Sequence, residues 1–251
     1  MRKLVTVFAA LAVAGMAMAQ AESQIVGYVT KATIANKMDI LGVPFQNVGE
    51  TTVNIQDIIP GTGIDVWGGD VLRVWDSLLG TYTYAYYFGE TYNADYSLEL
   101  GAGWSDGDQI RSDVEIAAGQ GFVLTTAANA SVIVKGEVLT ADDNKLSTVQ
   151  NKMDILCNTF PTDINIQDIA PVSGIDIWGG DVLRVWDSDA ATYTYAYYFG
   201  ETYNSDYSVE LGAGWSDGDQ IRLDIPIAAG QGFVLTTASD AVVSFPVPTG
   251  I

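Results

Sequence analysis

The sequence predicts an all-β protein made of two tandem copies of one β-module. Segments of the first half recur almost unchanged in the second half, which is the pattern of an internal duplication. Glycine is frequent, with 26 residues, and short apolar segments alternate with turn residues. About six or seven short strands per module indicate a small β-sandwich or a Greek-key barrel, and the sequence leaves both folds open.

The first 21 residues have the features of a secretory signal peptide. A short positive segment, residues 1–3, precedes an apolar run over residues 4–18, and small residues mark candidate cleavage sites near Ala19 and Ala21. A membrane anchor is the alternative, but about 16 apolar residues are fewer than the roughly 18 to 20 that a spanning helix needs. We expect residues 1–21 to be removed and the mature chain to be secreted, to a periplasm or to the extracellular space.

The duplication sets the predicted domain boundaries. Residues 81–111 match residues 192–222 with only two changes, Ala94 to Ser205 and Leu98 to Val209. The copies differ mostly at expected turns, and each has a length typical of one domain. The mature chain is therefore divided into module 1, residues 22–140, and module 2, residues 141–251.

Short apolar runs bounded by turn residues give the expected strands of module 1. The dipeptides Asp106-Gly107 and Asp217-Gly218 favour tight hairpin turns. Residues 54–59 predict one helical turn with Asn54 as its cap. The expected strands are residues 25–30, 38–43, 71–75, 81–88, 109–111, 121–126 and 132–138.

One apolar strand occurs in three versions, at residues 25–30, 132–140 and 242–248, for only two modules. A spare version could complete the sheet of a neighbouring molecule, and such head-to-tail self-association forms filaments when the geometry does not close. The alternative is that each strand packs in its own module. Pro246 and Pro248 favour this alternative at the C-terminus, because proline blunts an edge strand.

Composition excludes several functions. Lys and Arg number 11 against 31 Asp and Glu, and this charge of −20 opposes binding to nucleic acid or to an anionic membrane. The chain has no histidine and one cysteine, which excludes Ser-His-Asp and Cys-His catalysis, His-ligated metals and internal disulfides. Paired carboxylates leave glycoside hydrolysis as an enzymatic alternative. We expect a protein without enzymatic activity, resident cofactor or membrane insertion.

An aromatic face is the first candidate binding surface. With a period of two, Tyr82, Tyr84 and Tyr86 share one face of their strand, and Arg73 and Trp75 share one face of the preceding strand. Such rings could stack on an extracellular glycan or contact a protein partner. The alternative is ordinary cross-strand pairing in a half-buried sheet. With the second copy, the candidate ligand-binding residues are Arg73, Trp75, Tyr82, Tyr84, Tyr86, Arg184, Trp186, Tyr193, Tyr195 and Tyr197.

Acidic residues on glycine-rich turns are the second candidate site. Carboxylates in such loops suit calcium, a hard cation that is bound by oxygen ligands. The loops lack the spacing and the terminal Glu of an EF-hand, so a hairpin turn with solvated charge is the alternative. The candidate metal ligands are Asp106, Asp108, Asp217 and Asp219.

Two motifs carry a resemblance to known proteins. They are Ile25-Val26-Gly27-Tyr28 and Ala118-Gly119-Gln120-Gly121-Phe122, and the second recurs at residues 229–233. The mature chain resembles a loose group of uncharacterised secreted bacterial β-repeat proteins. This resemblance implies β-rich extracellular modules and supplies no activity or site residues.

The sequence therefore favours a structural or interaction protein of the cell surface or extracellular matrix, with self-association as one expected mode. The alternative is a carbohydrate-binding protein that uses the aromatic face and is stabilised by calcium in the acidic loops.

Overall fold

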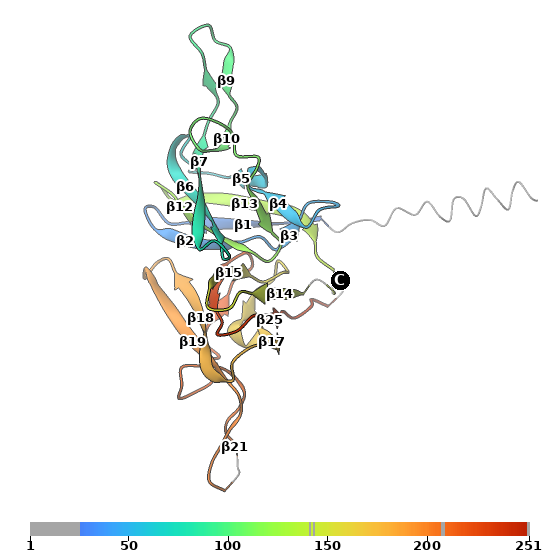
Figure 1. Cartoon of the computed structure of the whole chain (residues 1–251). Coiled ribbons are helices and arrows are strands. Elements are labelled where there is room, and N and C mark those ends of the chain that lie inside the picture. The colour runs from blue at the N-terminus through green and yellow to red at the C-terminus, as the bar shows by residue number, and fades with distance from the viewer. Residues whose placement is uncertain (1–25, 141, 143, 207–208, 250–251) are drawn as a thin grey trace, which may run out of the picture.

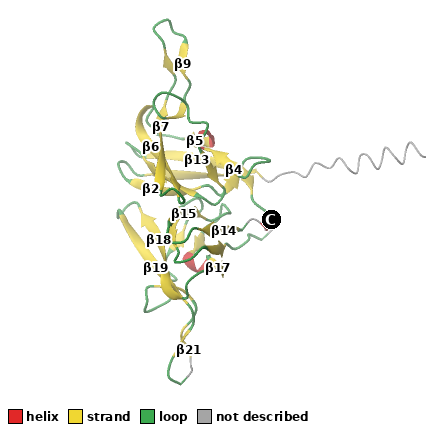
Figure 2. Ribbon diagram, in the orientation of Figure 1, coloured by secondary structure: helices red, strands yellow, loops and turns green. Residues whose placement is uncertain are grey.

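A computed structural model describes residues 26–140, 142, 144–206 and 209–249. The predicted signal peptide, residues 1–21, lies outside the described residues. The fold is all-β, as predicted: the named strands pair in antiparallel sheets, and the helical segments of the described chain are single 3-10 turns (Figure 2). Within the described residues, no helix is long and apolar enough to cross a membrane.

The first half forms two main sheets. The larger sheet has the order β10-β7-β6-β12-β2, and the smaller has the order β1-β13-β3, with β5 also paired to β13. A short pair, β4 and β11, lies beside them. The strands are β1 (Val26–Thr33), β2 (Met38–Gly42), β3 (Phe45–Gln46), β4 (Thr52–Asn54), β5 (Ile58–Pro60), β6 (Trp67–Asp76), β7 (Thr81–Phe88), β10 (Gly103–Ser105), β11 (Glu115–Ala117), β12 (Gly121–Thr125) and β13 (Ala130–Val138).

The second half repeats this arrangement. Its larger sheet has the order β15-β24-β18-β19-β22, and its smaller sheet has the order β14-β25-β17. A short pair, β16 and β23, again lies beside them. The strands are β14 (Lys145–Thr148), β15 (Met153–Cys157), β16 (Ile164–Asn165), β17 (Ala170–Ser173), β18 (Trp178–Asp187), β19 (Thr192–Phe199), β22 (Gly214–Ser216), β23 (Pro226–Ile227), β24 (Gly232–Thr236) and β25 (Ala241–Ser244).

Each half has its own apolar core. Alternation along β6 and β12 directs Leu72, Phe122 and Leu124 into the first core, where all three are buried. Trp104 is buried beside them, and its indole nitrogen donates to the Ile58 carbonyl at 3.1 Å, so this large ring is packed without an unsatisfied donor. A separate cluster around Trp215 forms the core of the second half.

The terminal strands pack within their own halves. β1 pairs with β13 along its whole length, from Val26 opposite Glu137 to Thr33 opposite Ala130. β25 pairs with β14 and β17. In this molecule the middle version of the repeated strand thus belongs to the first half.

The local predictions had two outcomes. The helical turn is confirmed: Ile55–Asp57 is a 3-10 turn, and the Asn54 side chain accepts the Gln56 amide at 2.9 Å. The strand expected at residues 109–111 is wrong. After the turn at Gly107 the chain makes only one bridge, between Ile110 and Ser105, and then leaves the sheet.

The two halves pack against each other through the outer faces of their larger sheets. We call this contact the seam. Its buried centre is formed by equivalent residues from both copies, Ile40 with Ile155 and Val123 with Val234. Backbone hydrogen bonds cross the seam from the Gly42 amide to the Gly230 carbonyl at 2.9 Å, and from the Cys157 amide to the Gly119 carbonyl at 2.8 Å. Equivalent positions of the two copies therefore meet around a local two-fold axis.

Two long hairpins extend from this body in opposite directions (Figure 1). Arm 1, residues 90–102, contains β8 (Thr91–Tyr92) and β9 (Leu98–Leu100). Arm 2, described at residues 201–206 and 209–213, contains β20 (Thr202–Tyr203) and β21 (Val209–Leu211). The seam thus places the same hairpin at both ends of the molecule.

Candidate functional site

The predicted aromatic face is present as cross-strand pairs on the larger sheets. β6 and β7 place Trp75 opposite Tyr82 and Arg73 opposite Tyr84. The Arg73 guanidinium lies 6.0 Å from the centroid of the Tyr84 ring, within the range of a cation–π contact. The second half repeats this arrangement with Arg184 over Tyr195, also at 6.0 Å.

The seam covers much of this face. The indole nitrogen of Trp75 donates to the Met153 carbonyl of the other half, and Trp186 donates to Met38 in the equivalent way, each at 2.5 Å. The phenols paired with these tryptophans are half-buried there. Burial raises the pKa of Tyr82, and likewise of Tyr193.

The outer part of the aromatic face remains accessible. Tyr84 and Tyr195 are exposed, whereas Tyr86 and Tyr197 are only partly exposed. The ten predicted residues therefore divide between a contact that joins the halves and a smaller accessible surface around each Arg–Tyr pair.

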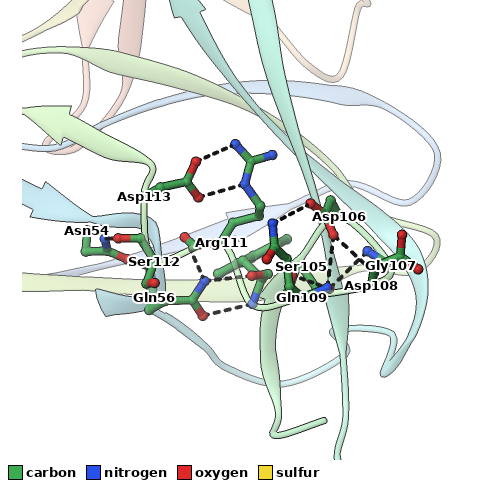
Figure 3. A network of polar contacts seen from close by, with 11 residues as sticks. Asn54, Gln56, Ser105, Asp106, Gly107, Asp108, Gln109, Arg111, Ser112 and Asp113 are labelled. Carbon is green, nitrogen blue, oxygen red and sulfur yellow. Dashed lines mark hydrogen bonds and ion pairs between the residues drawn. The ribbon is translucent and has the colours of Figure 1, made fainter.

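The acidic loops are built as hairpin turns. One carboxylate oxygen of Asp106 accepts the backbone amides of Asp108 and Gln109, each at 3.0 Å (Figure 3). These amides hold the pKa of Asp106 below its ordinary value, and Asp217 has the same bonds to Asp219 and Gln220. Across the described residues, no three His, Cys, Asp or Glu side chains are grouped to hold a metal ion. Calcium binding by these loops stays a prediction.

A partly buried amide and an ion pair connect the loop behind these turns to the rest of the first half (Figure 3). The Gln56 side chain donates to the Trp104 carbonyl at 2.7 Å and accepts the Trp104 amide at 3.0 Å. Arg111 donates from two nitrogens to the two carboxylate oxygens of Asp113, at 2.8 and 2.9 Å. These bonds connect the loop between Trp104 and Asp113 to the 3-10 turn that contains Gln56.

Two equivalent cavities lie near the seam. Their volumes are about 450 and about 430 Å³. The first is lined by Thr83, Arg111 and Gln120, among others, and the second by Thr194, Arg222 and Gln231. Sequence analysis did not identify these cavities, because their walls come from segments that lie far apart in the chain, and the second also includes Ile34 of the other half.

An exposed tryptophan at each end was also missed. Trp67 and Trp178 have 82% and 81% of their surface exposed. The turn beneath Trp67 is ordered: the Asp65 carboxylate accepts the Trp67 amide at 2.9 Å and the Gly69 amide at 3.2 Å. The neighbouring Gly68, with φ of 85°, packs against the Phe88 ring, where a Cβ atom would lie 2.5 Å from the nearest ring carbon. A large ring is thus held in solvent by a defined backbone.

The arms carry further exposed aromatic and apolar side chains. Tyr92 donates a hydrogen bond to Glu90, and this bond raises the pKa of Tyr92. At the tip, the Asn93 amide donates to the Ser97 carbonyl at 2.9 Å, and Tyr96 is 88% exposed. Trp67 and arm 1 adjoin, because Trp67 is the register partner of Phe88, the last residue of β7 before the arm. We call this surface end 1, formed by Trp67, Tyr92, Tyr96 and Leu98, and its copy end 2, formed by Trp178, Tyr203 and Val209.

No family model, curated protein or solved structure matches this chain.

Proposed function

We propose that this chain is a secreted, non-enzymatic interaction protein of the cell surface or extracellular matrix that binds one kind of partner at both of its ends. Tyr96 carries the proposal. Its φ of 66° is left-handed, a conformation that costs a residue with a Cβ atom roughly 1–2 kcal/mol. With 88% of its surface exposed, the ring has little packing to offset this cost. Strain of this kind at an exposed aromatic residue is typical of a contact site.

The comparison of the two copies supports the same surface. Residues 89–108 recur at 200–219 with only the two changes already given, although most of them are exposed. Some buried positions have changed between the copies: Val43 of the first copy is Asn158 in the second, and Val134 is Phe245. A recent duplication alone would let exposed positions diverge at least as fast as the core. Retention of the arms therefore favours a role for them.

The two-fold arrangement supports binding at both ends. We infer that each half is a module of the sandwich or Greek-key type, because each has its own sheets and its own core. With the arms pointing in opposite directions, one molecule can contact two partners at once (Figure 1). Such a molecule would cross-link a repeated partner, and its retention on a multivalent surface would exceed the affinity of one end.

Retention on extracellular matrix or envelope material from the native source tests this proposal. The variants are Trp67→Ala, Trp178→Ala and their combination, which keep the fold because both rings are exposed. We expect each single variant to lower apparent affinity by about 10- to 100-fold, and the double variant to abolish retention. The matched control is Leu78→Ala with Leu79→Ala, which truncates exposed apolar side chains that the second copy lacks. Full retention of the double variant would refute the proposal.

Glycan binding is the second candidate, and the two equivalent cavities favour it. Their hydroxyl, amide and guanidinium groups are suited to the hydrogen bonds that sugars make. The same retention assay distinguishes it: retention that survives loss of both tryptophans and is competed by a soluble polysaccharide would support this candidate instead. Substitution of Trp75 and Trp186 does not test glycan binding alone, because each indole also donates a hydrogen bond across the seam.

A further inference from the structure

We propose that the partner bound at each end is a protein with a cationic surface, contacted through its Lys or Arg side chains. This inference rests on the proposed function, because it names the partner class of the same two ends. It is carried by the charge of the end surfaces together with their exposed rings.

The charge of each end has one sign. Residues 90–108 contain five carboxylates and no Lys or Arg, and the same is true of residues 201–219. The carboxylates are Glu90, Asp95, Glu99, Asp106 and Asp108 at end 1, and Glu201, Asp206, Glu210, Asp217 and Asp219 at end 2. The nearest guanidinium beyond each segment, on Arg111 or Arg222, is already bonded to an aspartate of its own loop. At end 2 the Arg222 guanidinium also lies 3.9 Å from Asp217, so one of the five carboxylates there has a cationic partner. Each end nevertheless carries a net negative charge, which a partner with positive charge would meet.

Hydrogen bonds keep some of these groups charged and oriented. Asp95 accepts the Ser97 hydroxyl at 2.6 Å and the Ser97 amide at 3.0 Å, which lowers the pKa of Asp95. Asp106 is held by backbone amides in the same manner. These hydrogen bonds favour the ionised forms of Asp95 and Asp106 and fix the direction of their carboxylates.

The surface also offers a recess for a cationic side chain. At end 2, Glu210 of the arm and Asp219 of the hairpin turn line a cavity of about 290 Å³, together with Phe199 and Thr202. A Lys or Arg side chain could enter with its alkyl stem along the ring and its charge beside the carboxylates. The exposed rings of the arms supply further faces for cations.

Charge also argues against other occupants. A second copy of this chain carries the same five carboxylates at each end, so contact between ends would bring like charges together. Nucleic acids and anionic membranes are repelled for the same reason. A neutral glycan could donate hydroxyl hydrogen bonds to the carboxylates but would gain no charge attraction, and it is therefore an outcome that the test must detect.

The experiment measures binding of a decameric Arg-Gly repeat peptide to the full secreted chain by calorimetry, with a Ser-Gly decamer as the uncharged control probe. The end-neutral variant replaces Glu90, Glu99, Glu201 and Glu210 with Gln. The matched control removes four exposed or partly exposed charges elsewhere, through Glu50→Gln, Glu137→Gln, Asp142→Asn and Asp189→Asn. Retention on native extracellular material is measured for the same proteins.

We expect two equivalent peptide sites per chain, affinity about tenfold weaker in the end-neutral variant, and a change below about twofold in the matched control. Retention on native extracellular material should be lower for the end-neutral variant than for the wild type. Retention of the wild type should decrease with added salt. Equal peptide binding by both variants, or retention that is insensitive to salt and to the end-neutral variant, would overturn the cationic partner. Should the Trp67 and Trp178 variants still lose retention in that case, the proposed function would stand with a neutral partner such as a glycan.

Discussion

At the scale of single residues, the most informative position is the one where the two copies meet. Gly42 and Cys157 are equivalent in the duplication, and they face each other across the seam. A Cβ atom on Gly42 would lie 2.1 Å from the Cβ atom of Cys157. One of the two positions must therefore lack a side chain. This explains why a glycine stands in one copy and a buried cysteine in the other.

Exchanging the two residues tests this explanation. Gly42→Ala should lower the free energy of unfolding by about 1–3 kcal/mol through overpacking. Gly101→Ala is the matched control, because no atom lies within 4 Å of the added carbon. The exchange Gly42→Cys with Cys157→Gly should recover most of the stability that Gly42→Cys alone loses, as a coupled pair requires. Urea unfolding measures these four variants, the single variant Cys157→Gly and the wild type, and additive effects of the two changes in the exchange would contradict the contact.

At the scale of elements, the sequence was informative where alternation was strict. Residues 81–88 were predicted with the bounds of β7, because every second residue is aromatic. The arms were missed, because β8 and β9 have two and three residues and no regular alternation. The same limit applies to Trp75. A period of two shows that the Trp75 side chain points away from the core of its own half. The period does not tell whether that outer face of the sheet meets solvent or a second sheet.

The seam should respond to alkaline pH. Burial raises the pKa of Tyr82 and of Tyr193 above the ordinary value of 10.0. Above about pH 10 the unfolded chain therefore releases phenolic protons that the folded chain retains, and the stability of the fold decreases as pH rises. Lys31, whose pKa is lowered by burial, acts in the opposite direction.

Tyr82→Phe with Tyr193→Phe isolates the tyrosine effect. We expect this variant to lose less thermal stability than the wild type between pH 9 and pH 11, in melting curves followed by circular dichroism. Tyr96→Phe serves as the control at an exposed phenol. The same loss in all three proteins would show that the seam tyrosines do not set the alkaline response.

At the scale of the whole molecule, duplication and the seam together determine what the ends can do. Two copies joined around a local two-fold axis present the same arm in opposite directions (Figure 1). No arm residue that the structure describes belongs to either core, so the arms could serve binding while the rest of each half maintains the fold. The sequence predicted the repeat and a repeated contact surface. It could not indicate the ends, where we propose that this surface lies, since their position depends on how the halves pack.

Replacing Tyr96, at the tip of arm 1, and Tyr207, its equivalent in the sequence, tests the central claim most directly, because folding and binding should then change in opposite directions. Tyr96→Gly with Tyr207→Gly removes two rings, and at Tyr96 it also relieves a left-handed backbone. We predict a melting temperature equal to or above that of the wild type, since glycine adopts this conformation without strain. We also predict loss of retention on native extracellular material. Unchanged retention, or a fold that is clearly less stable, would contradict the account, because the tyrosines would then be dispensable for binding or would serve the fold.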